Sequence, residues 1–150
     1  VNSPAFNVFL AAQEHLNCNS LFMNGLKVGD LITISGDIHH IFPRAYLRSN
    51  GVNSKTKYNQ VANYIYLDTQ GNKAISDAAP CEYFGRALRQ CETKELKLGN
   101  ITELTLLKEN LAENCIPETV IEMDASRYDE FLIERRKLMA VMMRRYYMSL

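Results

Sequence analysis

The pattern of apolar and polar positions along this 150-residue chain predicts helices near both ends and a short β segment between them. Residues 4–15 are predicted to be helical, because a serine can act as the N-cap and a proline occupies the first turn. Residues 17–36 are predicted to be irregular. Helical periodicity returns over 101–111, and a long helix is predicted from about 124 to 149. The apolar side chains of that last helix are expected to pack in the core: Tyr128, Phe131, Leu132, Leu138, Met139 and Met142.

Two short strands are predicted in the middle of the chain. Residues 37–42 (DIHHIF) indicate an extended stretch, and the proline that follows ends regular strand pairing. Residues 64–67 are rich in β-prone side chains and predict a second strand. The stretch 48–59 (RSNGVNSKTKYN) between the two strands is expected to be a polar loop.

A turn and a helix are predicted after the second strand. Residues 68–72 (DTQGN) have turn chemistry. Asn72 would then lie at or near the N-terminus of a helix that is interrupted near Pro80 and Gly85. The order strand, long loop, strand, turn and helix predicts an α+β fold that is mostly helical.

The chain is expected to form a single domain, because 150 residues can bury one sound core. It starts at Val1 without a methionine, and we interpret it as a C-terminal fragment of a longer protein. No signal peptide and no long apolar run are found, so a cytoplasmic location without membrane insertion is expected. The four cysteines form no C-x-x-C pair, which disfavours a structural zinc site and predicts free, mostly buried thiols.

Two adjacent histidines, His39 and His40, and two later asparagines, Asn63 and Asn72, are the most informative polar residues. Phosphodiester hydrolysis needs an activated water, and an imidazole with a near-neutral pKa is a suitable general base. A divalent cation can neutralise the developing charge, and hard cations prefer carboxylate and amide oxygens. Since successive strand residues point to opposite faces, Asp37 and His39 should share one face and His40 the other.

These residues resemble the core of the HNH (ββα-metal) nucleases, and in particular the C-terminal HNH domain of GmrSD-like restriction endonucleases. That family carries a D-x-[E/H]-H-I-[F/L]-P motif, which residues 37–43 match. An asparagine-led strand follows, here NYIYLDTQ, and then an asparagine that heads a helix, here NKAIS. Three later segments are also similar to this subfamily: Ala79–Phe84, Cys115–Pro117 and Phe131–Arg136. The resemblance implies a small ββα-metal core at about 31–90, embedded in helices at 3–15 and 101–150.

The resemblance also implies a role for each polar residue. His40 matches the general base, Asn63 the residue that orients the base, and Asn72 a metal ligand. An acidic residue commonly precedes the base in HNH proteins, but this chain has His39 there and Asp37 two positions further back. The first metal ligand is therefore Asp37, His39 or both. One divalent ion is implied, Mg²⁺ or Mn²⁺, and an imidazole ligand would favour manganese, nickel or zinc over magnesium.

The charge distribution favours a nucleic-acid contact beside the motif, although the net charge of zero argues against a generally basic binder. Between residues 39 and 73 only one acidic side chain, Asp68, stands against five basic ones: Arg44, Arg48, Lys55, Lys57 and Lys73. We expect these five to contact the DNA backbone. The competing interpretation is that loop lysines are merely solvated.

The function implied by the resemblance is metal-dependent cleavage of DNA, as the effector part of a restriction or anti-phage protein. Its expected partners are DNA and an N-terminal ParB-like domain of the same protein. One alternative is a catalytically inactive HNH fold that serves as a DNA-binding or protein-interaction module. Another is a nuclease directed at RNA.

Overall fold

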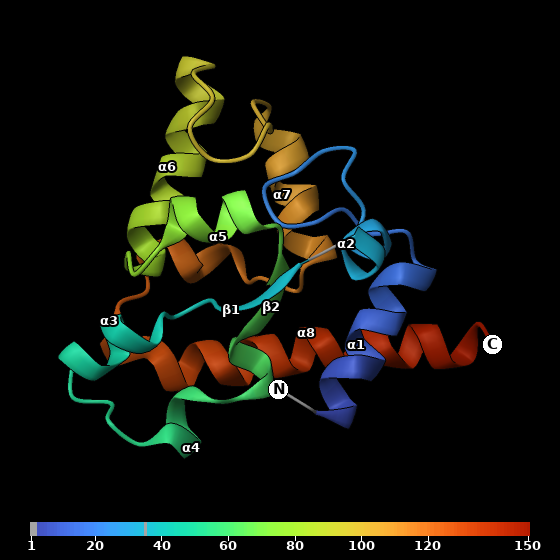
Figure 1. Ribbon diagram of the computed structural model, residues 1–150, viewed down its shortest axis with the longest axis horizontal. Coiled ribbons are helices and arrows are strands. Elements are labelled where there is room, and N and C mark those ends of the chain that lie inside the picture. Colours follow the sequence, from blue (N-terminus) through green and yellow to red (C-terminus); the bar gives the residue numbers. More distant parts are fainter. Residues whose placement is uncertain (1–2, 35) are drawn as a thin grey trace.

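Helices surround a two-stranded antiparallel sheet in the computed structural model, which describes residues 3–34 and 36–150 (Figure 1). The longer helices are α1 (Pro4–His15), α6 (Pro80–Thr93), α7 (Leu104–Glu113) and α8 (Tyr128–Met148). The shorter ones are α2 (Val28–Ile34), α3 (Arg44–Ser49), α4 (Lys55–Tyr58) and α5 (Thr69–Ile75). Three 3₁₀ turns are η1 (Val61–Asn63), η2 (Glu118–Glu122) and η3 (Ala125–Arg127). The strands are β1 (Asp37–His40) and β2 (Tyr64–Leu67), so the predicted mostly helical α+β class is confirmed.

The sheet joins the two predicted strands in one register. Asp37 lies opposite Leu67, and His40 lies opposite Tyr64. The pairing continues past β1, because the amide of Ile41 donates a 2.8 Å hydrogen bond to the carbonyl oxygen of Asn63. Figure 1 shows α5 alongside this sheet, with α3 beyond the end of β1.

Three sequence predictions about helices were wrong. Residues 17–36 are not wholly irregular, because they contain α2, which buries Val28 and Leu31. The predicted polar loop at 48–59 contains the end of α3 and all of α4. Gly85 does not interrupt α6, since an interior glycine costs only about 1 kcal/mol and its neighbours Tyr83 and Phe84 are buried.

The predicted start of the first helix is confirmed, whereas the predicted start of the last helix is wrong. The side-chain oxygen of Ser3 accepts a hydrogen bond from the amide of Phe6, which confirms it as the N-cap of α1. The last helix begins at Tyr128 rather than near 124, because Asp124 caps the separate turn η3. Of the six side chains expected to pack from that helix, Leu138 is 40% exposed and Met142 is half-buried, whereas four are buried: Tyr128, Phe131, Leu132 and Met139.

The hydrophobic core packs side chains of the first and last helices together with the residue that follows β1. Phe9 of α1 and Phe131 of α8 are fully buried, as is Phe42 directly after β1. The ring centroids of Phe42 and Phe131 are 4.9 Å apart. Helix α8 also buries Arg135, whose guanidinium lies 5.6 Å from the ring centroid of Phe9. The long C-terminal helix is therefore part of the support of the sheet.

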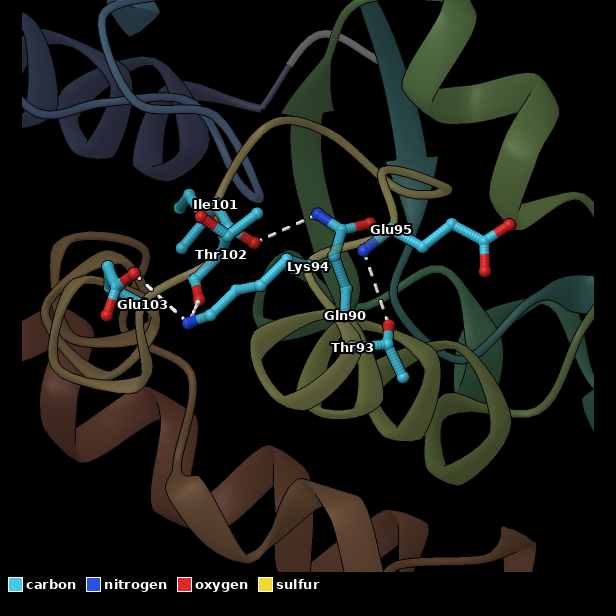
Figure 2. Close-up of polar contacts among 7 residues, drawn as sticks. All are labelled: Gln90, Thr93, Lys94, Glu95, Ile101, Thr102 and Glu103. Carbon is cyan, nitrogen blue, oxygen red and sulfur yellow. Dashed lines mark hydrogen bonds and ion pairs between the residues drawn. The ribbon is translucent and has the colours of Figure 1, made fainter.

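The connection between α6 and α7 is organised by the buried side chain of Gln90 (Figure 2). Its amide nitrogen donates to the carbonyl oxygens of Leu98 and Ile101, at 3.1 and 2.9 Å. Its amide oxygen accepts from the backbone amides of Lys97 and Leu98. At the surface, the ammonium group of Lys94 forms a 3.1 Å ion pair with Glu103. One glutamine thus satisfies four backbone groups of a connection that lies away from the sheet.

The cysteines of the described chain are free thiols. Cys18, Cys91 and Cys115 are buried, and Cys81 is half-buried. Burial raises the pKa of Cys18 and of Cys115 to about 11, so both are protonated at neutral pH. Among the described helices, none combines the length and the apolar character needed to cross a membrane.

Candidate functional site

A pocket of about 600 Å³ lies beside β1 and brings together most of the residues singled out by the sequence. Three consecutive residues of this strand line it, Ile38, His39 and His40. In the described chain β1 pairs only with β2, so its other edge is free. Side chains from both faces of a strand can reach one pocket along such an edge. The adjacent histidines therefore share a pocket although they alternate along the strand.

The imidazole of His40 is half-buried and contacts Asn59 and Tyr64. Its Nε2 lies 3.0 Å from the side-chain oxygen of Asn59, and its ring meets the edge of Tyr64 at a centroid distance of 5.2 Å. Because an amide oxygen only accepts, Nε2 carries the proton in this arrangement and Nδ1 keeps a lone pair. Burial lowers the pKa of His40, the contact with Asn59 raises it, and the charge of Arg44 lowers it again. A neutral imidazole with a free Nδ1 suits a general base.

Asn63 occupies a different place from the one expected. It is fully buried, and its side-chain oxygen accepts a 2.8 Å hydrogen bond from the amide of Phe42. Its amide nitrogen donates to the carbonyl oxygens of Phe42 and Tyr58, both at 3.1 Å. The hydrogen bond to the imidazole of His40 that the sequence assigned to Asn63 is made instead by Asn59. Asn63 turns into the core because it precedes β2 in η1, where it secures the segment that follows His40.

The sequence did not single out Asn59. It lies at the end of the predicted polar loop, which contains two further asparagines, Asn50 and Asn53. Only the return of the chain from α4 towards β2 brings this asparagine against His40. Sequence spacing alone offers no signal for such a contact.

His39 is buried, with 8% of its surface exposed, and lies opposite Ile65 in the sheet. Its Nε2 has no hydrogen-bond partner among the described residues. Burial lowers the pKa of His39 to about 4, against the opposing effects of the Asn72 amide and the Asp77 carboxylate. The ring is therefore neutral at pH 7, which is the form that binds metal ions.

Asn72 lines the pocket from α5, one turn inside the helix rather than at its head. The helix starts earlier than expected because Asp68 acts as its N-cap and accepts a 3.2 Å hydrogen bond from the amide of Gly71. A Cβ at position 71 would come within 2.7 Å of the Asp68 carboxylate, so glycine permits this cap. The cap thus sets which turn of α5 faces the strand.

Asp37 is not among the residues that line the pocket. It shares a strand face with His39, as expected, but it is exposed and lies about 7 Å further along the strand. The geometry therefore brings His39 and Asn72 together and leaves Asp37 outside.

The five basic side chains fall into two groups. Arg44, Arg48 and Lys73 line the pocket beside the histidines. Lys55 and Lys57 are exposed on α4, and Lys57 borders a separate groove. The expected cationic surface is therefore concentrated at the pocket on α3 and α5 and continues less directly over α4.

The donors in the pocket fit an open site for a hard cation better than a closed one. Among the described residues, no cluster of three or more His, Cys, Asp or Glu side chains could hold a metal ion. The pocket instead offers an imidazole with an unpartnered nitrogen and the side-chain amide of Asn72. Such a set leaves several positions for water, as is common for catalytic Mg²⁺ and Mn²⁺.

No protein-family model, curated protein or solved structure matches this chain.

Proposed function

We propose that this domain is a metal-dependent endonuclease of the HNH type that cleaves DNA phosphodiester bonds. The observation that supports it most is the meeting, in one pocket, of His40, His39, Asn72 and three cationic side chains. The two antiparallel strands followed by α5 correspond to the ββα-metal core in this proposal. The resemblance of residues 37–43 to the HNH motif points to the same chemistry.

In the proposed reaction, Nδ1 of His40 takes a proton from a water molecule whose oxygen attacks the phosphorus. A new P–O bond forms, the bond to the leaving 3′ oxygen breaks, and that oxygen takes a proton from solvent. Arg44, Arg48 and Lys73 bind the non-bridging oxygens of the phosphate and its neighbours. Asn59 holds the imidazole in the tautomer that leaves Nδ1 free. A divalent cation held by His39 and Asn72 would neutralise charge at the phosphate and the leaving oxygen.

The biological role that fits is the effector part of a restriction or anti-phage protein. Contacts to the phosphate backbone confer affinity without sequence information, so a preceding ParB-like domain would choose the target. The proposed substrate is foreign DNA in the cytoplasm. This role comes from the resemblance of the motifs, whereas the chemistry comes from the pocket.

Nicking of supercoiled plasmid tests the proposal directly. We expect cleavage with Mn²⁺ or Mg²⁺ and none with EDTA. His40→Ala should lower the rate on the order of 10²–10⁴-fold, the usual contribution of general acid–base catalysis, while its affinity for Mn²⁺ stays unchanged. His15→Ala is the matched control, because His15 is exposed and contacts Tyr146 on α8 rather than the pocket.

Each alternative gives a different result in this assay. An inactive module would bind DNA but would not nick it with any divalent ion. A nuclease directed at RNA would prefer a single-stranded RNA competitor to plasmid. Nicking by His40→Ala at the wild-type rate would remove His40 from the mechanism.

A further inference from the structure

We infer that Asp77 is the anionic ligand of the divalent cation in this pocket, completing a site with His39 and Asn72. The inference rests on the proposed function, because it deepens the metal site of the same pocket. The sequence motifs assign no role to Asp77.

The first observation is the charge of the pocket wall. Asp77 is the only acidic residue among those that line the pocket, whereas Arg44, Arg48 and Lys73 bring three positive charges to it. His39 and Asn72 are neutral donors. A doubly charged cation beside three fixed positive charges needs an anionic ligand, and Asp77 is the carboxylate within the pocket.

The second observation is the unpartnered nitrogen of His39, which lines the same pocket as Asp77. His39 is more than nine-tenths buried, and its Nε2 lacks a hydrogen-bond partner among the described residues. A buried polar atom without a partner is costly unless a ligand satisfies it. Both His39 and Asp77 line this pocket, and the charge of Asp77 raises the pKa of the same imidazole against the effect of burial.

Two unfavourable features surround Asp77: a rare backbone conformation at the residue before it and its own negative charge at a helix C-terminus. Helix α5 ends at Ile75, and Ser76 follows with φ 50° and ψ −128°, a conformation that non-glycine residues rarely adopt. Asp77 then lies just past the C-terminus of α5, where the helix dipole disfavours a negative side chain. A bound cation at this position would offset the unfavourable charge.

The donor types fit a hard, open site. A carboxylate oxygen, an amide oxygen and one imidazole nitrogen suit Mn²⁺ and Mg²⁺, and the imidazole shifts the preference towards Mn²⁺. With three protein ligands, the remaining positions stay available to water and to phosphate oxygens. The cationic rim is then free to bind the rest of the substrate.

Mn²⁺ titrations followed by calorimetry and by the EPR signal of free Mn²⁺ test this inference. Asp77→Asn keeps the size of the side chain and removes its charge, so we expect the Kd for Mn²⁺ to rise at least tenfold. Asp77→Glu should retain more affinity than Asp77→Asn. Asp129→Asn is the matched control, because Asp129 is exposed at the start of α8 and should leave the Kd unchanged.

Thermal unfolding in EDTA establishes that all variants are folded. Equal Mn²⁺ affinity of wild type and Asp77→Asn, or no Mn²⁺ binding by wild type, would overturn the role of Asp77. Plasmid nicking, measured separately, reports on the proposed function. Mn²⁺ binding that depends on Asp77, without nicking, would support this metal site and reject the nuclease function. Nicking together with an unaltered Kd in Asp77→Asn would support the nuclease function and reject the role of Asp77.

Discussion

The guanidinium of Arg135 donates a 2.6 Å hydrogen bond to the carbonyl oxygen of Tyr64, which is paired with His40 in the sheet. A second hydrogen bond of 2.8 Å goes to the carbonyl oxygen of Ala62, so Arg135 binds the backbone on both sides of Asn63. A third reaches the carbonyl oxygen of Asn114. Burial lowers the pKa of Arg135 to about 10, so it stays charged at neutral pH. The C-terminal helix thus holds the strand that supports the site.

Replacing Arg135 should therefore destabilise the whole domain. Arg135→Met leaves three buried carbonyl oxygens without their donor, and we expect a loss on the order of 3 kcal/mol or more in the free energy of unfolding. Arg135→Lys should recover only part of this loss, because an ammonium group lacks the planar fork of the guanidinium. Urea unfolding measures both variants. Arg136→Met is the control, since Arg136 is exposed; an equal effect at both positions would contradict the role given to Arg135.

Asn59 and Asn63 should separate catalysis from stability. Asn59→Ala removes an exposed contact, so the free energy of unfolding should change by less than about 0.5 kcal/mol. Loss of that contact lowers the pKa of His40, so the acidic limb of the pH–rate profile should move to lower pH, with a reduced maximal rate.

Asn63→Ala should mainly reduce the stability of the fold. It leaves three buried backbone groups unpaired and should cost on the order of 3 kcal/mol in the free energy of unfolding. Urea unfolding and pH–rate profiles of both variants provide the comparison. A stable Asn63→Ala protein with a shifted pH profile would restore Asn63 as the residue that orients His40.

DNA should run across the pocket between α3 and α5. Reversing Arg44 and Arg48 to glutamate should weaken binding equally on unrelated sequences and lower the salt slope by about two, since each phosphate contact contributes about 0.9. Reversing Lys55 and Lys57 should weaken binding less, because these residues are on α4 outside the pocket. Binding is measured by fluorescence anisotropy in EDTA over a range of salt concentrations. A larger effect from the lysine pair would move the path over α4.

Acid should destabilise the metal-free protein through His39. Its folded-state pKa of about 4 lies below the ordinary value of 6.5 for histidine, so the unfolded chain binds more protons between these pH values. The free energy of unfolding should therefore be fully retained above about pH 6.5 and fall as pH drops towards 4, by on the order of 3 kcal/mol. Urea unfolding in EDTA at pH 7 and pH 4.5 tests this. His39→Gln does not titrate and should show a clearly smaller fall; an identical fall would assign the effect to other groups.

The strands and the first helix could be predicted because their signals are local. The N-cap serine of α1 and the β-prone run at 64–67 each act within a few residues. Helix α2 was missed because its two buried residues, Val28 and Leu31, are too few to establish a period. The partner of His40 was misassigned because the contact from Asn59 depends on how the chain returns to β2, not on spacing.

The pocket residues also show that sequence spacing does not reveal which side chains meet in three dimensions. Alternation along β1 correctly placed Asp37 and His39 on one face, but burial differs along that face, and only His39 reaches the pocket. Asp77 was not singled out from the sequence because it follows a helix end and shares a pocket with His39 only in three dimensions.

The pairing of β1 with β2 also distinguishes two chemically identical side chains. A shift of β1 by one residue that placed His40 opposite Ile65 would put the proposed base in the buried position of His39, and Ile41 would then take the place beside Asn59. The hydrogen bonds of Asn63 to Phe42 lie just past the pair and oppose such a shift. A single inserted residue between His40 and Phe42 would therefore leave every candidate side chain present, yet place His40 in the buried position of His39 and leave Asn59 without an imidazole partner.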